Sequence, residues 1–328
     1  MYYYHGNAYW RPYEQESLEK YFGKPEPIES SNYLFTRFNT ESISQNYYNH
    51  ALEIEKGFKG HIINPTKHFK YTNNKEECFL AWERIGIPVP KFFEYKDRED
   101  FENKRIDYPF LIRLNDFATG EYTYLINDET EFNQKFRILE EAHKNLQRIN
   151  TKKICVQFID TKVKDFHTSF RIHVAGNSVI SGYGRLSKSW LAITGKFEES
   201  MKEDWVEQNI RVNKIIKNNK QLIIDSVIKL GLHHQGLDII ADRNNNIYFL
   251  EMQPFYFSGR NHGENNTLPP FWNPYKPKLL VDWLANDKNE LYSQIPNYYD
   301  LWLDKKNHFD NAYYSLKKFT DEQSLQST

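Results

Sequence analysis

The most restrictive feature of the sequence is a segment near residue 240 that is typical of a β-hairpin with two acidic residues facing each other. Residues 236–254 place the turn-forming run Asp-Arg-Asn-Asn-Asn between two stretches rich in β-forming side chains. If the hairpin is symmetric about Asn244 and Asn245, Asp238 on the first strand lies opposite Glu251 on the second. The same register gives two further pairs, Ile240 with Phe249 and Asp242 with Ile247.

Two carboxylates that face each other across neighbouring strands repel, and burial increases the cost. A divalent cation removes this conflict, and Mg²⁺ is usually bound by one or two carboxylates together with phosphate oxygens. Gln253 lies two residues beyond Glu251 on the same face and adds a neutral oxygen, while Gly236 opposite it leaves room for a ligand. We therefore expect Asp238, Glu251 and Gln253 to bind Mg²⁺, with Mn²⁺ as a substitute. In the alternative, Asp238 caps a loop and Glu251 pairs with a surface lysine.

The composition excludes several classes of protein. The 328 residues carry 43 Lys and Arg against 44 Asp and Glu, and this net charge of −1 gives no overall attraction to nucleic acid or anionic lipid. The net charge does not exclude a local basic cleft. A mean hydropathy of −0.77, with no run of about 20 apolar residues, excludes an integral membrane protein. The two cysteines, Cys78 and Cys155, form no CxxC pair and are expected to be buried in a protein of a reducing compartment. Since no signal peptide is visible, we expect a cytoplasmic protein without nucleic-acid or membrane partners.

Aromatic residues make up 16% of the chain, which argues against disorder because their burial offsets the entropy lost on folding. They concentrate at residues 1–48 and 248–314. We expect these terminal regions to pack together and to wall the substrate side of the molecule. The tyrosines at residues 2–4 and the tail at 283–302 are the candidate surfaces for a homodimer.

The chain mixes patterns of antiparallel hairpins with helical patterns, which favours an α+β fold over a doubly wound parallel sheet. Besides the hairpin, strands are expected at residues 33–37, 61–64, 108–114, 121–125, 153–159, 169–174 and 177–183. Helices are expected at residues 45–56, 74–85, 129–150 and 219–230, with loop and helix at 192–220. Asn74, with Glu77 three residues later, predicts a capped helix start.

The order of several motifs resembles that of the ATP-grasp superfamily, in particular its carboxylate–amine ligases of the RimK and glutathione-synthetase types. Lys75 opens a helix that leads into Gly-Ile-Pro-Val-Pro at residues 86–90, and Arg113 follows Pro109 in an apolar strand. Downstream come Val-Gln-Phe-Ile-Asp at 156–160, an Arg-x-x-Val-x-Gly-like hairpin at 170–180, and the metal hairpin. The resemblance covers roughly residues 66–260.

The resemblance implies a role for each matching residue. The matches are Lys75 and Arg113 for the nucleotide phosphates, Gly120 for the loop that covers them, Gln157, Phe158 and Ile159 for the adenine hinge, Arg171 and Arg185 for the transferred phosphoryl group, and Asp238, Glu251 and Gln253 for the metal. Beyond the hairpin, Arg260 is the residue best suited to clamp a substrate carboxylate, because a guanidinium donates in a fork. Its alternative is a solvated loop arginine.

The resemblance also implies an ATP-grasp fold in which two α/β subdomains, residues 66–152 and 153–260, clasp Mg-ATP. An abbreviated N-terminal region, 1–65, would precede them, and an aromatic-rich tail, 261–328, would pack on the core. The implied reaction is ligation, in which a small-molecule or peptide carboxylate attacks the γ-phosphate and an amine displaces phosphate from the acyl phosphate.

Three alternatives remain open. One is an ATP-grasp kinase that phosphorylates a hydroxyl group and releases no free phosphate. Another is a nucleotide-binding protein without catalysis, because Arg113, Gln157 and Gln253 each depart from the residue that the superfamily usually has. The last is a protein that does not bind ATP and whose hairpin only resembles the metal site.

Overall fold

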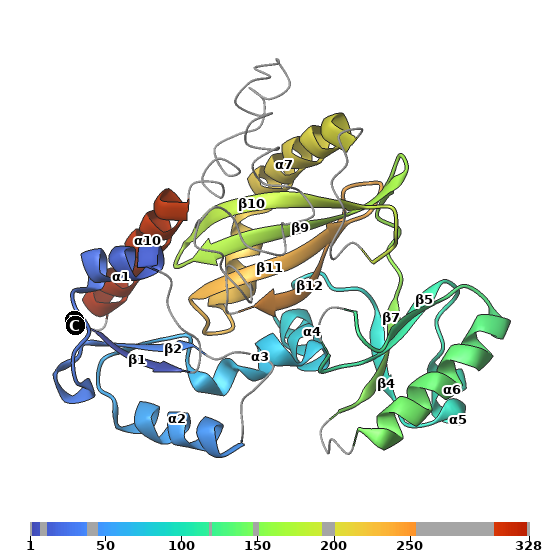
Figure 1. Ribbon diagram of the computed structural model, residues 1–328, viewed down its shortest axis with the longest axis horizontal. Helices are drawn as coiled ribbons and strands as arrows, with labels where there is room; N and C mark the ends of the chain where they lie inside the picture. The colour runs from blue at the N-terminus through green and yellow to red at the C-terminus, as the bar shows by residue number, and fades with distance from the viewer. Residues whose placement is uncertain are drawn as a thin grey trace.

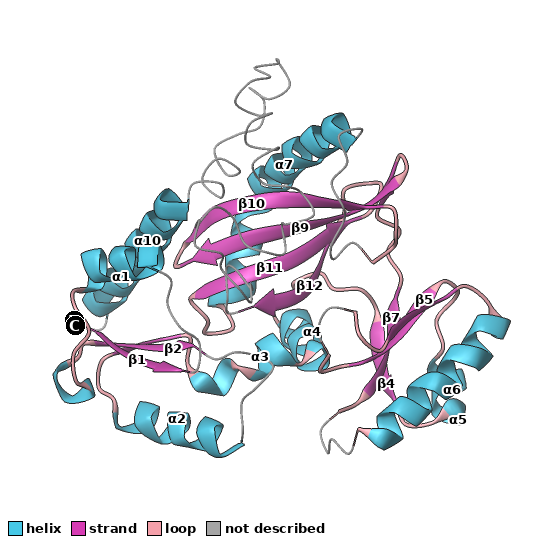
Figure 2. Cartoon of the chain, in the orientation of Figure 1, coloured by secondary structure: helices cyan, strands magenta, loops and turns pink. Residues whose placement is uncertain are grey.

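The computed structural model describes residues 2–6, 12–37, 45–117, 120–146, 151–191, 201–253 and 305–326. In these residues the strands form three sheets, with helices packed on them (Figure 1, Figure 2). Two of the sheets are antiparallel and the N-terminal one is parallel. This combination of helices and mostly antiparallel strands confirms the predicted α+β class.

The N-terminal residues form a parallel sheet in the order β1-β2-β3. Its elements are β1 (Tyr2–Gly6), α1 (Pro12–Phe22), a 3₁₀ turn η1 (Ile28–Ser30), β2 (Tyr33–Arg37), α2 (Gln45–Gly57) and β3 (His61–Ile63). The predicted unit of two strands and a helix is confirmed as β2, α2 and β3. The structure adds β1 and α1, which the sequence patterns did not indicate.

The middle of the chain builds an antiparallel sheet in the order β4-β7-β5-β6. Its strands are β4 (Phe92–Tyr95), β5 (Phe110–Leu114), β6 (Thr123–Ile126) and β7 (Lys153–Gln157). The accompanying helical segments are η2 (Thr66–His68), α3 (Lys70–Asn73), α4 (Lys75–Arg84), α5 (Arg98–Lys104) and α6 (Glu129–Asn145). The predicted cap of α4 is confirmed, since the Asn74 side chain accepts a hydrogen bond from the amide of Glu77 at 3.1 Å.

The third sheet has the strand order β10-β9-β11-β12, with β8 added on β9. Its elements are β8 (Lys162–Val163), β9 (Phe166–Ala175), β10 (Ser178–Ser187), α7 (Lys202–Ile228), β11 (His234–Ala241) and β12 (Ile247–Gln253). Helix α7 lies against one face, where glycines make room for it. A Cβ atom on Gly184 would lie 2.4 Å from Cγ of Gln208, and one on Gly182 would lie 2.8 Å from Cδ1 of Ile216. The opposite face is therefore the one that can carry a site.

The predicted helix boundary at residue 219 coincides with a kink between two helical segments of α7. Helix α7 begins at Lys202 and continues through that point, where Asn219 has non-helical angles (φ −124°, ψ 20°) and donates a side-chain hydrogen bond to the carbonyl of Ile215. The helical part of the stretch expected as loop and helix, residues 192–220, is in the described residues the first segment of α7. Asn219 thus marks a kink inside one helix.

Helix α4 joins the two antiparallel sheets. Phe79 and Trp82 of α4 share one core with Ile154 of β7 and Phe249 of β12. The Trp82 indole donates to the carbonyl of Ser226 in α7 at 2.8 Å, and its ring lies 5.4 Å from that of Phe249. Because α4 is fixed to both sheets, its first residue is held where the sheets meet.

The chain termini pack on each other, as the aromatic pattern predicted. Helix α10 (Lys305–Gln326) lies beside α1 in Figure 1, and Phe22 shares a core with Tyr313. Ser17 donates to Asp310 at 2.6 Å, which ties the two helices together. The tail expected to wall the substrate side, including residues 283–302, lies outside the described residues.

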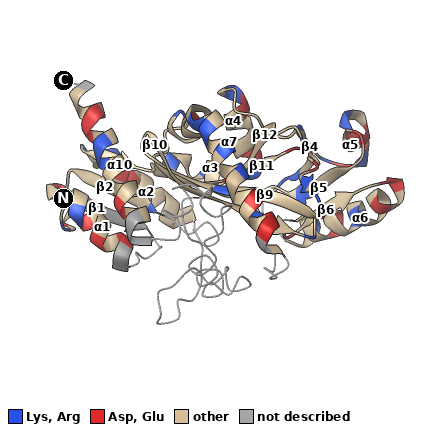
Figure 3. Ribbon diagram, turned by 90° about the horizontal axis from the view of Figure 1, so that it is seen from above, with Lys and Arg blue, Asp and Glu red and all other residues tan. Residues whose placement is uncertain are grey.

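The charge distribution, the hydropathy of the helices and the state of the two cysteines complete the description. Basic and acidic residues alternate on α5 and on α10, so neither end of the molecule carries a single sign of charge (Figure 3). Among the helices that the structure describes, none combines the length and apolar character that a membrane crossing requires. Cys78 and Cys155 are both buried and unpaired with each other, as expected.

Candidate functional site

The hairpin β11–β12 brings the two predicted carboxylates together. Asp238 pairs with Glu251, and Gly236 pairs with Gln253, which confirms the register at this end. The other end differs, because Ile240 lies opposite Tyr248 instead of Phe249 and Ala241 instead of Asp242 lies opposite Ile247. Hydrogen bonds between Asp242 and Asn246 close the turn, and Asn245 within it has a φ of 65°. Between the pairs Ile239–Phe249 and Asp238–Glu251, β12 has a one-residue bulge, which restores the predicted register at Asp238.

Asp238 has an acidic neighbour on one side and a basic neighbour on the other, because its strand β11 pairs with β12, which carries Glu251, and with β9, which carries Arg171. There it is opposite Arg171, whose Nη2 donates to Oδ2 of Asp238 at 2.9 Å. Arg171 Nε also lies 2.8 Å from Oδ1, although it is not aligned for a hydrogen bond. Arg185 from β10 donates its Nη2 to Oδ1 at 3.2 Å. The side chains of Arg171, Arg185 and Asp238 are 7%, 12% and 16% exposed, so this charge cluster is largely shielded from water.

Glu251 has a different set of neighbours. Lys75 Nζ at the start of α4 lies 3.3 Å from Oε2 of Glu251. Gln253 donates its Nε2 to Oε1 of Glu251 at 3.2 Å and accepts a hydrogen bond from Nη1 of Arg171 at 3.1 Å. Gln253 therefore links the group around Glu251 to the group around Asp238.

Lys75 and Arg113 converge on one backbone carbonyl. Lys75 Nζ donates to the carbonyl of Phe117 at 3.0 Å, and Arg113 Nη2 donates to the same oxygen at 2.9 Å. Arg113 Nε donates to the carbonyl of Leu114 at 3.1 Å. The amide of Lys75 donates to the carbonyl of Asn115 at 2.9 Å, so the start of α4 is fixed to the end of β5.

Both of these cations are desolvated. Burial lowers the pKa of Lys75, and the nearby Arg113 lowers it further, while Glu251 opposes the shift. Burial lowers the pKa of Arg113 to about 10, with Glu251 and Asp116 opposing the change. Arg113 stays protonated at neutral pH, and within the described residues its hydrogen bonds go to the carbonyls of Leu114 and Phe117 rather than to a carboxylate.

We call this set of side chains the charge network. Its members are Lys75, Arg113, Arg171, Arg185, Asp238, Glu251 and Gln253. These members include four cations and two carboxylates, an excess of two positive charges where α4 and the two antiparallel sheets meet, and Asp116 near Arg113 is a further carboxylate beside the network. Such an excess in a largely buried site suits an anion with several charges.

The other candidate residues lie apart from this network in the described contacts. Gly120 has a φ of 77° in the loop between β5 and β6. Gln157 ends β7, and its side-chain oxygen accepts from the amide of Lys91 at 3.2 Å. Phe158 lies 6.3 Å from the ring of His167, and Ile159 is buried. Arg260 lies outside the described residues.

Sequence patterns did not indicate the carbonyl of Phe117, although it receives both Lys75 and Arg113. A backbone acceptor has no side-chain signal, and the position of the loop directly after the strand of Arg113 is the one sign that the sequence offers. In the described part of the chain, no group of three or more His, Cys, Asp or Glu side chains is placed to hold a metal ion by itself.

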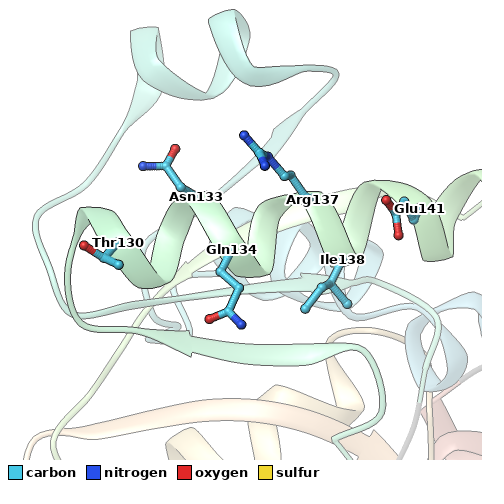
Figure 4. A pocket seen from close by; sticks show the side chains of 6 residues that line it. All are labelled: Thr130, Asn133, Gln134, Arg137, Ile138 and Glu141. Carbon is cyan, nitrogen blue, oxygen red and sulfur yellow. The ribbon is translucent and has the colours of Figure 1, made fainter.

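A hollow of about 510 Å³ lies elsewhere, along α6 (Figure 4). Its lining residues share one face of that helix and are Thr130, Asn133, Gln134, Arg137, Ile138 and Glu141. Since they come from a single helix, no groups converge on a ligand from opposite sides. The charge network is therefore the better candidate site.

Known proteins resemble this chain in both sequence and fold. A coenzyme gamma-F420-2:alpha-L-glutamate ligase of Methanocaldococcus jannaschii is 28% identical over 144 residues, which are 43% of this chain and 46% of that protein. The matched part thus spans about half the length of this relative. The D-alanine-D-alanine ligase of Coxiella burnetii covers 90% of this chain and 71% of its own, with a TM-score of 0.49 and 12% identity. A RimK domain ATP-grasp protein of Sphaerobacter thermophilus covers 90% and 98%, with a TM-score of 0.48 and 13% identity.

The family model of the RimK-like ATP-grasp domain matches residues 72–255, which are more than half of the chain and include every member of the charge network. This match confirms the predicted superfamily and the ATP-grasp fold. By this match the chain belongs to the RimK-like ATP-grasp family.

Proposed function

We propose that this protein is an ATP-dependent ligase that joins a carboxylate to an amine through an acyl phosphate, with Mg-ATP as co-substrate. The observation that carries the proposal is the charge network, in which four cations surround two carboxylates that face each other across β11 and β12. Membership of the RimK-like ATP-grasp family supports it.

We assign two of the four cations to binding of the nucleotide phosphates and the other two to stabilisation of the transferred phosphoryl group. Lys75 and Arg113 are held side by side by the carbonyl of Phe117, and we assign them to the α- and β-phosphates of the nucleotide. Arg171 and Arg185 lie on neighbouring strands beside Asp238, and we assign them to the negative charge that develops on the transferred phosphoryl group. Positioning and charge neutralisation are the main tasks in phosphoryl transfer, and these residues supply both.

The carboxylates suit a hard divalent cation. Asp238 and Glu251 offer oxygen ligands on one face of the sheet, and Mg²⁺ is typically held by one or two carboxylates plus substrate phosphates. When bound, the ion would neutralise phosphate charge and orient the γ-phosphate. The residues present therefore fit the ion, with Mn²⁺ as a chemically similar substitute.

In the proposed reaction the substrate carboxylate attacks the γ-phosphorus, and the bond to the β-phosphate oxygen breaks to release ADP. An amine then attacks the acyl carbon, and phosphate leaves as the amide bond forms. The amine loses a proton in this second step. Similarity to a glutamate ligase over 144 residues supports an amino acid as one substrate.

We propose the remaining roles on the same basis. The adenine would lie at the end of β7, against Gln157, Phe158 and Ile159, with residues 66–152 and 153–260 as the two halves that clasp it. The loop with Gly120 would cover the phosphates. Arg260 would clamp the substrate carboxylate.

Phosphate release tests this function directly. The full-length protein is given Mg-ATP with a pool of amino acids and small carboxylates, and free phosphate and new amide products are measured. A ligase releases phosphate in equal amount with ADP and with the amide product. A phosphorylated product without free phosphate would indicate a kinase instead, and no turnover with any pool would indicate a binding protein.

The substitutions Asp238→Asn and Glu251→Gln sharpen that assay. We expect either one to lower Mg-dependent turnover at least about 100-fold while the far-UV circular dichroism spectrum stays that of the wild type, because each removes a metal ligand of nearly unchanged size. Wild-type turnover in both variants would refute the metal assignment.

A further inference from the structure

Gln253 occupies an unusual position within the charge network. Its Oε1 accepts from Nη1 of Arg171 at 3.1 Å, and its Nε2 donates to Oε1 of Glu251 at 3.2 Å. On the neighbouring strand it faces Gly236, so no β11 side chain competes for its carboxamide. One side chain thus spans the distance between an arginine of β9 and a carboxylate of β12.

The chemistry of the two partners fixes the orientation of this carboxamide. A guanidinium only donates hydrogen bonds, and an ionised carboxylate only accepts them. If the amide of Gln253 were turned over, its NH₂ would face the NH groups of Arg171 and its oxygen would face the oxygens of Glu251. Both contacts would be repulsive, so Oε1 belongs with Arg171 and Nε2 with Glu251.

This orientation conflicts with a role in metal binding. An ionised carboxylate bound by arginine keeps further lone pairs and a negative charge for a cation, whereas the neutral Oε1 of Gln253 has two lone pairs, of which Arg171 takes one, and the NH₂ of Gln253 points at the carboxylate that would bind the metal. We propose that Gln253 is a positioning residue that fixes Arg171 relative to Glu251, and that it is not a third metal ligand. This inference rests on the proposed function.

The bridge restrains Arg171 at both ends of its guanidinium. Nη2 and Nε of Arg171 contact Asp238, and Nη1 of Arg171 donates to Gln253. The guanidinium plane therefore cannot turn without breaking at least one of these contacts. The same bridge occupies Oε1 of Glu251, while Oε2 faces Lys75. An asparagine is shorter by one methylene, about 1.5 Å, and would not reach both partners.

Two measurements on the full-length protein test this proposal. The first is Mn²⁺ affinity in the presence of ADP, followed by the electron paramagnetic resonance signal of free Mn²⁺, for the variants Q253A, Q253N and E251Q. The second is the exchange of the Arg171 Nε–H signal with water in the ligand-free protein, followed by ¹⁵N nuclear magnetic resonance and assigned with R171K. Gln221→Ala on α7, which removes a glutamine bonded to Asp225 outside the network, is the matched control.

We expect Q253A and Q253N to weaken Mn²⁺ binding less than threefold, while E251Q weakens it tenfold or more. We also expect both Gln253 variants to speed Arg171 exchange at least fivefold, with no change in the control. A loss of threefold or more in Mn²⁺ affinity in Q253A, or wild-type Arg171 exchange in either variant, overturns the proposal. If E251Q keeps wild-type Mn²⁺ affinity, the metal assignment of the proposed function fails, and the Arg171 signal still decides the role of Gln253.

Discussion

Two regions of the molecule bury charged and polar groups in different ways. In the charge network, four cations share two carboxylates, and Arg113 donates to backbone carbonyls. At the second region, which we call the terminal junction, α1, β2 and α10 meet the family domain. There Arg37 donates to Glu14 at 2.6 Å and Tyr313 donates to the same oxygen at 3.0 Å.

The terminal junction also contains uncharged polar contacts. Directly after β3, the side-chain oxygen of Asn64 accepts from the backbone amides of His233 and His234, at 2.9 and 3.1 Å, and the backbone amide of Asn64 donates to Nδ1 of His233 at 3.2 Å. The Arg37–Glu14 ion pair is balanced in charge, whereas the members of the network carry an excess of positive charge. From this difference we infer that the contacts of the junction contribute mainly to stability, and we propose that the network binds an anionic ligand.

The largest effect is expected when the excess charge is removed. The double variant K75A/R113A should lower the affinity for ADP with Mg²⁺ at least about 100-fold, because each lost charged hydrogen bond costs about 1.5–3 kcal/mol and about 1.4 kcal/mol is tenfold. Its melting temperature should stay the same or rise, since two desolvated cations are gone. Equilibrium dialysis with labelled ADP and a thermal unfolding scan measure the two quantities.

Wild-type ADP affinity in K75A/R113A would contradict the proposed difference between the two regions, because the positive charges of Lys75 and Arg113 would then not bind the nucleotide. A loss of stability of the size expected for the junction would contradict it too. Either result would place the network among structural ion pairs.

The second effect concerns the junction. Arg37→Met should lower the free energy of unfolding by about 3–5 kcal/mol, because it leaves the buried carboxylate of Glu14 without its guanidinium. The affinity for ADP with Mg²⁺ should not change. Urea unfolding measures the loss, and the double variant E14Q/R37M should recover part of it. A large change in nucleotide affinity in R37M would show that the two regions are not independent.

The third effect depends on pH. Burial lowers the pKa of His233 to about 4, with His68 and His61 adding to the shift, whereas an unfolded histidine titrates near 6.5. Between these values the unfolded chain binds more protons than the folded one. The free energy of unfolding should therefore be highest above pH 6.5 and fall as the pH drops toward 4, by at most about 1.4 kcal/mol per pH unit for this group.

Urea unfolding between pH 7.5 and 5 tests the junction in this way. His233→Asn keeps an acceptor for the amide of Asn64 but does not titrate, so its stability should fall less steeply with pH than that of the wild type. Parallel curves for the two proteins would exclude His233 as a source of the pH dependence.

The smallest effect is expected at an exposed ion pair that belongs to neither region. Lys229→Ala removes the contact of Lys229 Nζ with Oδ2 of Asp225, 2.8 Å long and at the end of α7. We expect a loss of less than about 0.5 kcal/mol in urea unfolding and no change in ADP affinity. A larger loss would mean that this surface pair contributes more to stability than exposed ion pairs usually do.

Local patterns predicted the parts of the site that depend on neighbouring residues in the chain. Alternation in the hairpin placed Asp238 opposite Glu251, and the spacing from Asn74 to Glu77 placed the start of α4. A symmetric turn predicts the wrong pairs next to the turn, where the register is shifted by one residue. Beyond the bulge on β12 the predicted pair of Asp238 with Glu251 is found. Periodicity is a property of short segments, so such predictions succeed where no distant element intervenes.

Apart from the packing of the two termini, contacts between distant segments had no signal in the local sequence patterns. The pairing of β11 with β9, which brings Arg171 to Asp238, joins residues that are far apart in the chain. The carbonyl of Phe117 depends on the path of a loop, and α10 depends on packing against α1 and β9. The superfamily resemblance named Arg171 and Asp238 but could not say that they contact each other.

The central claim is that the charge network binds a nucleotide together with a divalent cation. Isothermal titration of the wild-type protein with ADP, with and without Mg²⁺, tests it most directly. We expect saturable binding of one ADP per chain that tightens at least tenfold when Mg²⁺ is present, and loss of that tightening in E251Q. Absence of binding at millimolar ADP, or binding that Mg²⁺ does not change, would contradict it.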